Sequence, residues 1–591
     1  MSENKDWAHM WEQWQQTMTN AWQSWSQSLA GGATGWGVPG AWNAAAMPNL
    51  GGTMPDASQW LQGITGQAVT IQPDRLLQIQ KDFAEQAAAL WNSGLVNQPL
   101  SDRRFANEAW AGNPLSSYIA ASYMLNAKTL LALADAVEGD AKTRQRVMFA
   151  VQQWVDASAP SNFLAFNAEA LKKAVDTQGE SLMQGARNLV NDMQRGHVSM
   201  TDEEAFEVGV NVATSEGAVV FENELFQLIE YKPLTKQVYE RPFLLVPPCI
   251  NKFYILDLQP ENSFIRYAVE NGHRVFVVSW RNPDESLRHT TWDDYVENGA
   301  IRAITAVQDI TQAETINALG FCVGGTIVGN ALAVLAARGE KPVNSVTFLT
   351  TLLDFTDTGI LDVFIDENFV RFREMQFAQG GIMPGQDLAT TFSFLRPNDL
   401  VWNYVVGNYL KGEAPPPFDL LYWNSDSTNL PGPMYAWYLR NTYLENRLVK
   451  PGEATVCGEA LDFNLVDTPA YIYGSREDHI VPIGGAYATT QFWAGKKRFV
   501  MGASGHIAGV INPASKGKRS HWIGSDRRFP EDVNEWIAEA TEHKGSWWED
   551  WSDWLATHAG KKIAAPKTYG RARTKYKALE AAPGSYVKAK A

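Results

Sequence analysis

Cysteine is scarce in this chain. Three cysteines occur among 591 residues, at Cys249, Cys322 and Cys457. So few cysteines in so long a chain exclude a disulfide framework and indicate a reducing compartment. They are not spaced with histidines as zinc ligands are, so no structural zinc is expected.

Long apolar runs are also lacking. No stretch of about eighteen apolar residues occurs, so no transmembrane segment is expected. The N-terminal sequence MSENKDWAHMW has no basic segment followed by an apolar one, so no signal peptide is expected. The formal net charge of −15 disfavours non-specific nucleic-acid binding. Together these features predict a cytoplasmic protein without a nucleic-acid partner.

Tryptophan, by contrast, is abundant. The chain has 23 tryptophans, more than the core of a cytosolic enzyme is expected to need, and 45% of its residues are hydrophobic. Within residues 1–30 the apolar side chains recur in steps of three and four: Trp7, Trp11, Trp14, Met18, Trp22, Trp25 and Leu29. This spacing predicts a helix with one apolar face. Such a face suits an interface between water and an apolar phase, or a helical partner; it equally suits packing on its own protein or on a second copy.

The chain is long enough for two or more domains. A stretch rich in Gly, Ala, Pro and Asn follows the tryptophan helix, so we assign residues 1–56 to that helix and a flexible linker. Residues 57–205 form a mostly helical N-terminal domain, because apolar residues recur there with helical spacing. The expected helices are 76–92, 116–139, 141–157, 160–174 and 180–195. Asp102-Arg103-Arg104 is interpreted as a salt-linked surface or interdomain contact.

From Phe206 the pattern changes to strands that alternate with helices. The expected strands are 206–213, 218–222, 226–231, 241–248, 274–280, 316–319, 345–351, 468–475 and 497–501. The expected helices between them include 263–271, 292–312, 326–337 and 484–493. This alternation predicts βαβ units and a mostly parallel sheet, in an α/β domain covering residues 206–591.

One heptapeptide organises this domain: Gly320-Phe321-Cys322-Val323-Gly324-Gly325-Thr326. It lies between an expected strand and an expected helix and matches the G-x-S-x-G nucleophile elbow of the α/β-hydrolase fold, with cysteine in place of serine. The positions two before and two after the tip must be small, and Gly320 and Gly324 satisfy this. The amides that begin the helix favour a thiolate at Cys322. A buried structural cysteine beside a tight turn is the alternative.

The alternation of strands and helices stops at residues 355–467. This stretch contains turns, aromatic residues and helices without a clear sheet strand. An insertion of this size in an α/β-hydrolase is expected to be a cap that covers the active site and builds the substrate pocket.

An elbow nucleophile needs a base and an acid that orients the base. In this fold they follow in the order nucleophile, acid, histidine, each on a loop after a strand. Asp478 and His506 fit that order. Glu477 is a less favoured alternative to Asp478, because Asp478 is the one followed by the Ile-Val-Pro run, residues 480–482, that starts the next element. His479 adjoins Asp478 and should point the other way, so it is interpreted as a supporting histidine.

The oxyanion hole is expected to use the backbone amide of Val323 and a second amide from the loop after residues 241–248. Ile250 is the preferred second donor, and Asn251 is the alternative. Cys249 lies in the same loop and is interpreted as a packed residue. A thiolate exchanges acyl groups between thioesters at little free-energy cost, so cysteine at the elbow indicates acyl transfer rather than simple hydrolysis.

These motifs resemble one family, the class I polyhydroxyalkanoate synthases. The resemblance covers residues 100–591 and rests on Pro247-Pro248-Cys249-Ile250-Asn251-Lys252, Ser279-Trp280-Arg281-Asn282-Pro283, Gly320-Phe321-Cys322-Val323-Gly324-Gly325, Tyr473-Gly474-Ser475-Arg476-Glu477-Asp478-His479 and Gly505-His506-Ile507-Ala508-Gly509. It implies polymerisation of (R)-3-hydroxyacyl-CoA, chiefly 3-hydroxybutyryl-CoA, with release of CoA.

The resemblance also implies how the residues act. The growing chain would be held as a thioester on Cys322, His506 would activate the thiol, and Asp478 would orient His506 or help deprotonate the incoming hydroxyl. No cofactor or metal is implied. A homodimer at the surface of a cytoplasmic polymer granule is expected. Beyond what the resemblance implies, we hypothesise that the tryptophan helix contacts the polymer or a granule-coating protein. The CoA pocket should be locally cationic despite the acidic total charge, and Arg396, under the cap, is the candidate for binding the acyl-CoA substrate.

Two other functions stay open at this point. A cysteine-type α/β-hydrolase that cleaves esters or thioesters would share the same three side chains. A granule-organising scaffold would use the tryptophans without catalysis. The size of the insertion and the helical N-terminal domain argue against a simple esterase, and the intact Cys–Asp–His set argues against a scaffold.

Overall fold

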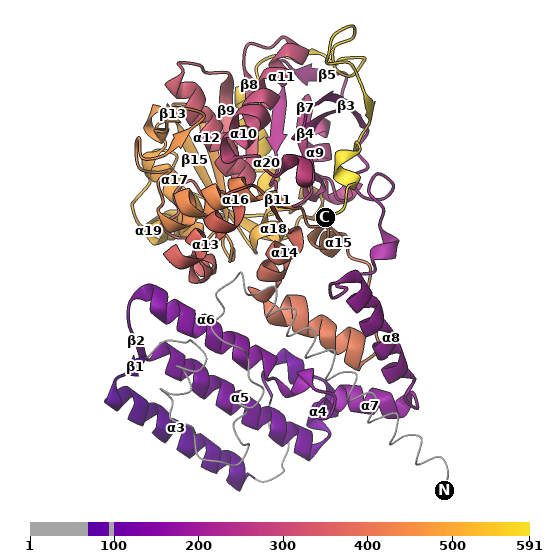
Figure 1. Ribbon diagram of the computed structural model, residues 1–591, viewed down its shortest axis with the longest axis vertical. Coiled ribbons are helices and arrows are strands. Elements are labelled where there is room, and N and C mark those ends of the chain that lie inside the picture. Colours follow the sequence, from indigo (N-terminus) through magenta and orange to yellow (C-terminus); the bar gives the residue numbers. More distant parts are fainter. Residues whose placement is uncertain (1–68, 94–99) are drawn as a thin grey trace. The chain divides into compact units, whose positions relative to one another are not determined.

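The computed structural model describes residues 69–93 and 100–591, and the chain divides into two compact units (Figure 1). Unit 1 comprises Met1–Asp202 and Thr390–Pro416; unit 2 comprises Glu203–Ala389 and Pro417–Ala591. The helix and linker expected at residues 1–56 lie outside the described residues.

Unit 1 is helical. Its main helices are α3 (Pro73–Asn92), α4 (Glu108–Ala111), α5 (Pro114–Asp135), α6 (Ala141–Ala157), α7 (Ala168–Asp176) and α8 (Glu180–Arg195). Local chemistry sets where they begin. The Asn113 side chain accepts from the amides of Leu115 and Ser116, and Pro114 starts α5. Asp140 caps α6 in the same way. The helix expected at 160–174 is instead a short 3-10 turn, Pro160–Asn162, followed by α7, because the Asn167 side chain caps a new helix there.

Part of the expected insertion packs into unit 1. Thr390–Pro416 includes the π-helical turns η11 (Asn398–Trp402) and η12 (Val405–Leu410). Val401, Trp402, Val405 and Tyr409 form a buried cluster against Ala157, Leu189 and Val198. The α/β domain predicted from the sequence, residues 206–591, includes this segment in one continuous stretch. In the structure the segment packs within unit 1, through contacts between residues that are far apart in sequence.

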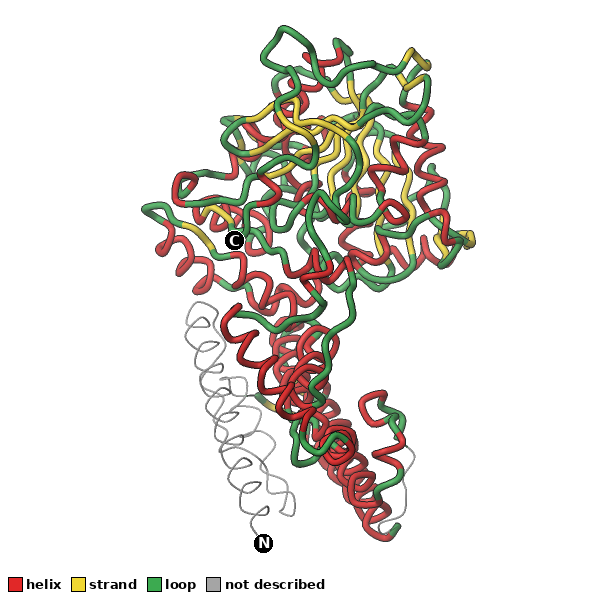
Figure 2. The backbone as a smooth tube through the Cα atoms, turned by 90° about the vertical axis from the view of Figure 1, so that its right-hand side faces the viewer, coloured by secondary structure: helices red, strands yellow, loops and turns green. Residues whose placement is uncertain are grey.

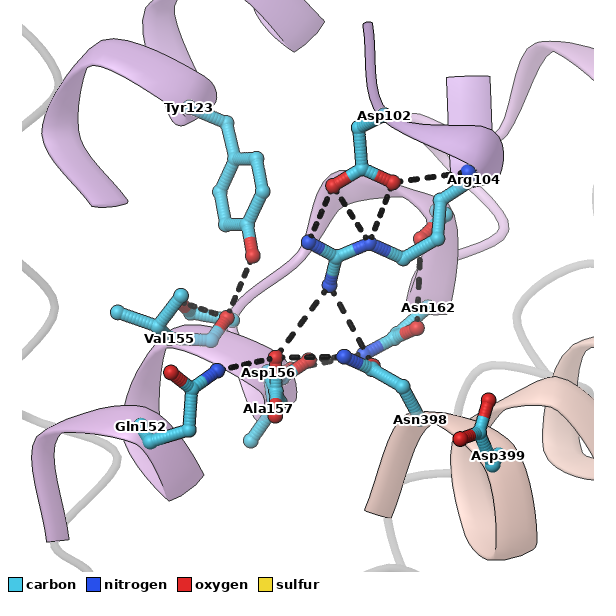
Figure 3. A network of polar contacts seen from close by, with 12 residues as sticks. Asp102, Arg104, Tyr123, Gln152, Val155, Asp156, Ala157, Asn162, Asn398 and Asp399 are labelled. Carbon is cyan, nitrogen blue, oxygen red and sulfur yellow. Dashed lines mark hydrogen bonds and ion pairs between the residues drawn. The ribbon is translucent and has the colours of Figure 1, made fainter. Parts of the chain in front are cut away.

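A polar network joins the same segment to the N-terminal helices (Figure 3). The Arg104 guanidinium bonds both carboxylate oxygens of Asp102 and lies 3.7 Å from the Asp156 carboxylate. Asn398 donates to Asp156 at 2.6 Å and accepts from Arg104 at 3.4 Å. Burial raises the pKa of Asp156, while its hydrogen bonds and Arg104 oppose the rise. The sequence Asp102-Arg103-Arg104 is therefore salt-linked within unit 1.

Unit 2 is built on one eleven-stranded sheet, visible as the gathered strands in Figure 2. Its strand order is β17-β16-β15-β14-β9-β8-β6-β7-β4-β3-β19. The strands are β3 (Gly217–Glu222), β4 (Phe226–Tyr231), β6 (Phe243–Val246), β7 (Val275–Trp280), β8 (Ile316–Phe321), β9 (Val343–Leu349), β14 (Ala470–Ser475), β15 (Lys497–Gly502), β16 (Ser520–Ile523), β17 (Thr541–Lys544) and β19 (Glu580–Ala581). The six strands from β7 to β15 pair in parallel, and antiparallel strands extend both edges. The expected α/β fold with a mostly parallel central sheet is confirmed.

Helices cover the sheet on both faces. The helices of this unit include α9 (Phe264–Glu270), α10 (Trp292–Asp294), α11 (Arg302–Thr311), α12 (Val323–Ala337), α17 (Ile483–Phe492), α18 (His506–Val510), α19 (Val533–Glu539) and α20 (Trp547–His558). The sheet residues Leu319, Phe321 and Tyr473 pack with α9 and α20. Gly320 and Gly474 alternate with them, so they face α12 and α17 on the opposite side.

Many tryptophans of the described residues are buried in the core, although from the sequence their number is expected to exceed what the core needs. Seven tryptophans rank among the largest fully buried side chains: Trp110, Trp292, Trp493, Trp536, Trp547, Trp548 and Trp551. Three of them lie on α20 and pack around Phe264 at centroid distances of 4.5–5.8 Å. The interpretation that tryptophan exceeds the needs of the core is thus wrong for this part of the chain.

The strand expected at 206–213 is also wrong. These residues form a tight turn with an isolated bridge between Val208 and Val212. Gly209 adopts a φ of 89°, and the Asn211 side chain bonds the backbone of Ala205 and Glu207. An asparagine that bonds nearby backbone in this way closes a turn, which prevents residues 206–213 from extending as a strand.

The insertion between β9 and β14 contains helices and short strand pairs outside the main sheet. Its elements include α13 (Glu367–Phe377), α14 (Gly385–Phe394), α15 (Asp419–Ser425), α16 (Gly432–Leu439) and the π-helical turn η13 (Arg440–Leu444). The short strands pair as β10 (Ile382–Met383) with β11 (Leu430–Pro431) and β12 (Thr455–Val456) with β13 (Glu459–Ala460). In the main sheet β9 pairs directly with β14, so the insertion leaves the order of the strands uninterrupted.

Candidate active site

Cys322 stands alone between a strand and a helix. β8 ends at Phe321 and α12 begins at Val323, while Cys322 has φ 53° and ψ −127°. A non-glycine residue with this backbone conformation is strained, and such strain gathers at active sites. A Cβ on Gly320 would lie 2.3 Å from the Gly325 Cα, and one on Gly324 would lie 2.3 Å from the Val246 oxygen. The glycines flanking the elbow are therefore required by close backbone contact.

Asp478 and His506 meet beside this elbow. Asp478 follows β14 and His506 starts α18 just after β15, two adjacent parallel strands. His506 Nδ1 lies 2.7 Å from Asp478 Oδ2. The other carboxylate oxygen, Oδ1, accepts the amides of Ile480 at 2.8 Å and Val481 at 2.9 Å. The Asp478 side chain has no exposed surface, so both its oxygens are held by the protein.

The imidazole of His506 is positioned between Asp478 and Cys322. Its ring stacks on Phe321 with the centroids 5.8 Å apart. Burial alone would lower the pKa of His506, but the negative charges of Asp478 and Cys322, with hydrogen bonds from the ring to both, raise that pKa to about 10. The ring therefore favours a proton when the carboxylate and the sulfur are charged, which is the arrangement of a thiolate–imidazolium pair.

The neighbours of Asp478 are placed differently. Glu477 is exposed, whereas Asp478 is buried at the imidazole, so the structure brings Asp478 to His506. His479 is half-buried, and its backbone oxygen lies near Gly359. Asp478 as the residue that orients His506 stays a prediction, and the contact between the two side chains supports it.

The loop that should supply the second oxyanion donor lies against the elbow. The start of α12 packs on the carbonyl oxygens of Val246 and Pro247, at the end of β6. Val323 is the first residue of α12, and the first amides of a helix lack a partner within it. Burial raises the pKa of Cys249, in the same loop, to about 12, and the charge of Cys322 adds to the rise. Cys249 is thus held as a neutral thiol, and Val323 and Ile250 stay the predicted amide donors.

Two tyrosines beside Cys322 were missed by the sequence argument. Tyr438 on α16 and Tyr443 on η13 have ring centroids 5.7 Å apart. Burial raises the pKa of both hydroxyls, and the charge of Cys322 is a further cause in each case. In the sequence the insertion is rich in aromatic residues, but none of them is assigned to the site. No spacing rule connects Tyr438 to the elbow, which precedes it by more than a hundred residues.

Arg396, the predicted substrate-binding residue, belongs to a different unit of the chain. It belongs to the Thr390–Pro416 segment of unit 1, whereas the three predicted catalytic side chains belong to unit 2. The Arg396 guanidinium pairs with Asp399 at 2.6 Å, and half of its side chain is exposed. Asp399 also pairs with Arg103. A role for Arg396 in binding acyl-CoA stays a prediction.

Residues 69–93 and 100–591 contain no group of three or more His, Cys, Asp or Glu side chains that could hold a metal ion. Nor is any helix of these residues long and apolar enough to cross a membrane.

The fold and the site define an enzyme of the α/β-hydrolase fold whose elbow carries a cysteine. A family model described as alpha/beta hydrolase fold matches residues 242–513, and one described as "Poly-beta-hydroxybutyrate polymerase (PhaC) N-terminus" matches residues 101–268. A "Poly(3-hydroxyalkanoate) polymerase subunit PhaC" from Cupriavidus necator is 61% identical over 88% of this chain and 90% of its own length. A "Poly(3-hydroxyalkanoate) polymerase" from Methylorubrum extorquens is 40% identical over 88% of each chain.

The chain belongs to the class I polyhydroxyalkanoate synthase family, as the motifs of the sequence indicated. It is an enzyme, an acyltransferase of that family. The non-catalytic scaffold alternative is therefore set aside.

Proposed function

We propose that this enzyme polymerises (R)-3-hydroxyacyl-CoA, mainly 3-hydroxybutyryl-CoA, into a polyester and releases CoA. The growing chain is held as a thioester on Cys322. The observation that carries this proposal is the strained elbow cysteine beside an imidazole whose other nitrogen is held 2.7 Å from a buried carboxylate. The names of the relatives in the family support the polymerising reaction over other acyl transfers.

The first half of the cycle loads Cys322. The thiolate attacks the carbonyl carbon of the acyl-CoA, and the amides of Val323 and Ile250 stabilise the oxyanion that forms. The bond from that carbon to the CoA sulfur then breaks. The departing CoA sulfur takes the proton of the His506 imidazolium, which leaves a neutral imidazole and an acyl thioester on Cys322.

The second half extends the chain. Neutral His506 removes the proton from the 3-hydroxyl of an incoming acyl-CoA as that oxygen attacks the carbonyl carbon of the acyl thioester on Cys322. An ester forms, the bond to the Cys322 sulfur breaks, and Cys322 leaves as a thiolate beside the protonated His506. The thiolate then attacks the CoA thioester of the extended chain as in the first half, so CoA departs and the chain is again held on Cys322. Asp478 orients the imidazole in this scheme. Both oxygens of Asp478 are already bonded, Oδ1 by two amides and Oδ2 by His506, which supports orientation over direct removal of the hydroxyl proton.

The product of the reaction tests this proposal. With purified enzyme and 3-hydroxybutyryl-CoA, we expect one CoA per monomer consumed and an insoluble polyester that yields 3-hydroxybutyrate only after alkaline hydrolysis. CoA release is followed with a thiol reagent, and the product is collected by centrifugation. Free 3-hydroxybutyrate in place of polymer would show a cysteine-type hydrolase instead.

The proposal extends to where the enzyme acts. We place it as a homodimer at the surface of a cytoplasmic polymer granule. Five tryptophans of the N-terminal apolar stripe would contact the polymer or a granule-coating protein: Trp7, Trp11, Trp14, Trp22 and Trp25. Deleting residues 1–56 should leave CoA release within about threefold of the full chain, because the predicted catalytic residues lie elsewhere, and should move the enzyme from sedimented granules to the supernatant. Unchanged sedimentation of the deletion variant would refute this role.

A further inference from the structure

Lys252 is a buried lysine in the loop that carries Ile250. Only 3% of its surface is exposed, and its ammonium donates to the Ala589 carbonyl at 2.5 Å. A buried ammonium is costly unless polar partners hold it. Burial lowers the pKa of Lys252 to about 8, although the charge of Asp426 opposes this and that of Lys590 adds to it. Nothing in the reaction scheme above uses this side chain.

The partner of Lys252 is the last part of the chain. Residues 585–590 form a strap, with the 3-10 turn Tyr586–Lys588 and the fully buried side chain of Val587. Its residues bond back to the sheet: the amides of Ser585 and Tyr586 both donate to the Gln227 side chain at 3.1 Å. The Lys590 carbonyl accepts from Asn282 at 2.8 Å. The strap is therefore an ordered part of unit 2.

Asp426 is a second buried charge, and it stabilises the ammonium of Lys252. Its carboxylate is 2% exposed, accepts from the Tyr254 hydroxyl at 2.9 Å, and pairs with the Lys590 ammonium at 3.1 Å. The Lys590 ammonium also lies 5.4 Å from the Tyr422 ring centroid. A buried carboxylate needs such a cation, since its lost hydration is otherwise uncompensated.

Backbone contacts connect these side chains to the predicted oxyanion loop. The Thr428 amide donates to the Ile250 carbonyl at 3.1 Å, and the Trp423 indole donates to the Lys252 carbonyl at 2.8 Å. Asn251 forms a bridge with Ser427. The segment 423–428 thus bonds the backbone of the loop at residues 250–252. The strap bonds the side chain of Lys252, which belongs to the same loop.

We propose that Lys252, Asp426 and Lys590 are positioning residues for catalysis, which hold the Ile250 amide at the elbow through the strap at residues 585–590. The three charges join three segments that are distant in sequence: the loop after β6, the segment 423–428, and the end of the chain. Oxyanion donors act only when they are held where the charge develops. This inference rests on the proposed function and identifies what positions its oxyanion donor.

Lys590→Gln is the most informative variant, because Lys590 is 62% exposed and its replacement leaves every buried side chain of the site in place. Its melting temperature measures how far the loss of the cation beside the buried Asp426 lowers stability. We expect kcat for CoA release from 3-hydroxybutyryl-CoA to fall about three- to tenfold, with KM within about threefold. For Lys252→Met we expect a larger fall in kcat, on the order of tenfold to a hundredfold, approaching the loss of one oxyanion donor. Lys588→Gln is the matched control, since Lys588 is exposed in the same strap and takes part in none of the contacts above.

Alkylation of Cys322 by iodoacetamide separates positioning from loss of structure. This reaction needs the thiolate and an intact elbow but forms no oxyanion, so its rate should stay within about twofold of wild type in Lys590→Gln and Lys252→Met. A structural defect would lower alkylation and kcat together. Lys252→Arg keeps the charge and a donor, and should recover part of the lost kcat.

A double-mutant cycle tests the pairing itself. In an Asp426→Asn background, Lys590→Gln should change kcat little further, because the charge partner of Lys590 has already been removed. Equal kcat values for Lys590→Gln and Lys588→Gln, or independent effects of the Asp426 and Lys590 changes, would overturn the proposal. All comparisons are made with a full-length wild type that releases CoA, so failure of the proposed function would appear in that wild type first.

Discussion

Replacing Cys322 with serine should lower CoA release from 3-hydroxybutyryl-CoA by about a thousandfold or more, the scale on which loss of an enzyme nucleophile is felt. A serine hydroxyl does not form the ion pair with His506 that a thiol can form. An acyl group on serine would also be an oxygen ester, a poorer donor to the next unit than a thioester. Initial rates of CoA release at saturating substrate measure the effect.

Cys457→Ser is the matched control for this variant. Its thiol is half-buried and donates to the Asp293 carbonyl at 3.5 Å, a contact that a hydroxyl can keep. We expect its CoA release to stay within about twofold of wild type. If Cys322→Ser instead kept more than a tenth of the wild-type rate, Cys322 would not be the acyl carrier.

Asp478→Asn should lower CoA release by on the order of a hundredfold to ten-thousandfold, as expected when the residue that orients a catalytic histidine loses its charge. In the wild type, Oδ1 accepts the amides of Ile480 and Val481, so only Oδ2 faces His506. An amide that keeps its oxygen on those two donors must turn its NH₂ group toward Nδ1. That favours the opposite tautomer of the imidazole and removes the charge that raises the pKa of His506.

The neighbouring carboxylate provides the control for this variant as well. Glu477 is exposed and does not reach the imidazole, so Glu477→Gln should leave the rate within about twofold. A loss of activity in Glu477→Gln that equals the loss in Asp478→Asn would point to the charge of the whole loop rather than to Asp478. The melting temperatures of both variants show whether folding is affected.

The elbow and its partners were predictable because their signals are local. Gly320 and Gly324 are required within one tight turn, and the spacing appears directly in the sequence. Asp478 and His506 each follow an apolar strand in the chain order of the fold. Parallel pairing of β14 with β15 then brings the two loops to one edge of the sheet.

The remaining features depend on contacts between distant segments. The sequence around Thr390–Pro416 gives no sign that this segment packs with α6 and α8. Its apolar residues have the same helical spacing as those of the other helices in the insertion. Tyr438 and Lys252 carry no local signal either. Lys252 was part of a family motif, but its contact with Ala589 joins positions 337 residues apart. Composition was misleading for tryptophan, since a count does not separate buried rings from exposed ones.

Capture of the acyl enzyme tests the central claim most directly. The enzyme is mixed with 3-hydroxybutyryl-CoA, quenched in acid during turnover and digested, and the peptide that contains Cys322 is examined by mass spectrometry. The account predicts 3-hydroxybutyryl units on Cys322, removable by neutral hydroxylamine as thioesters are and absent from the peptides of Cys249 and Cys457. Polymer formation with Cys322 unmodified at every quench time, or with the acyl chain on another residue, would contradict it.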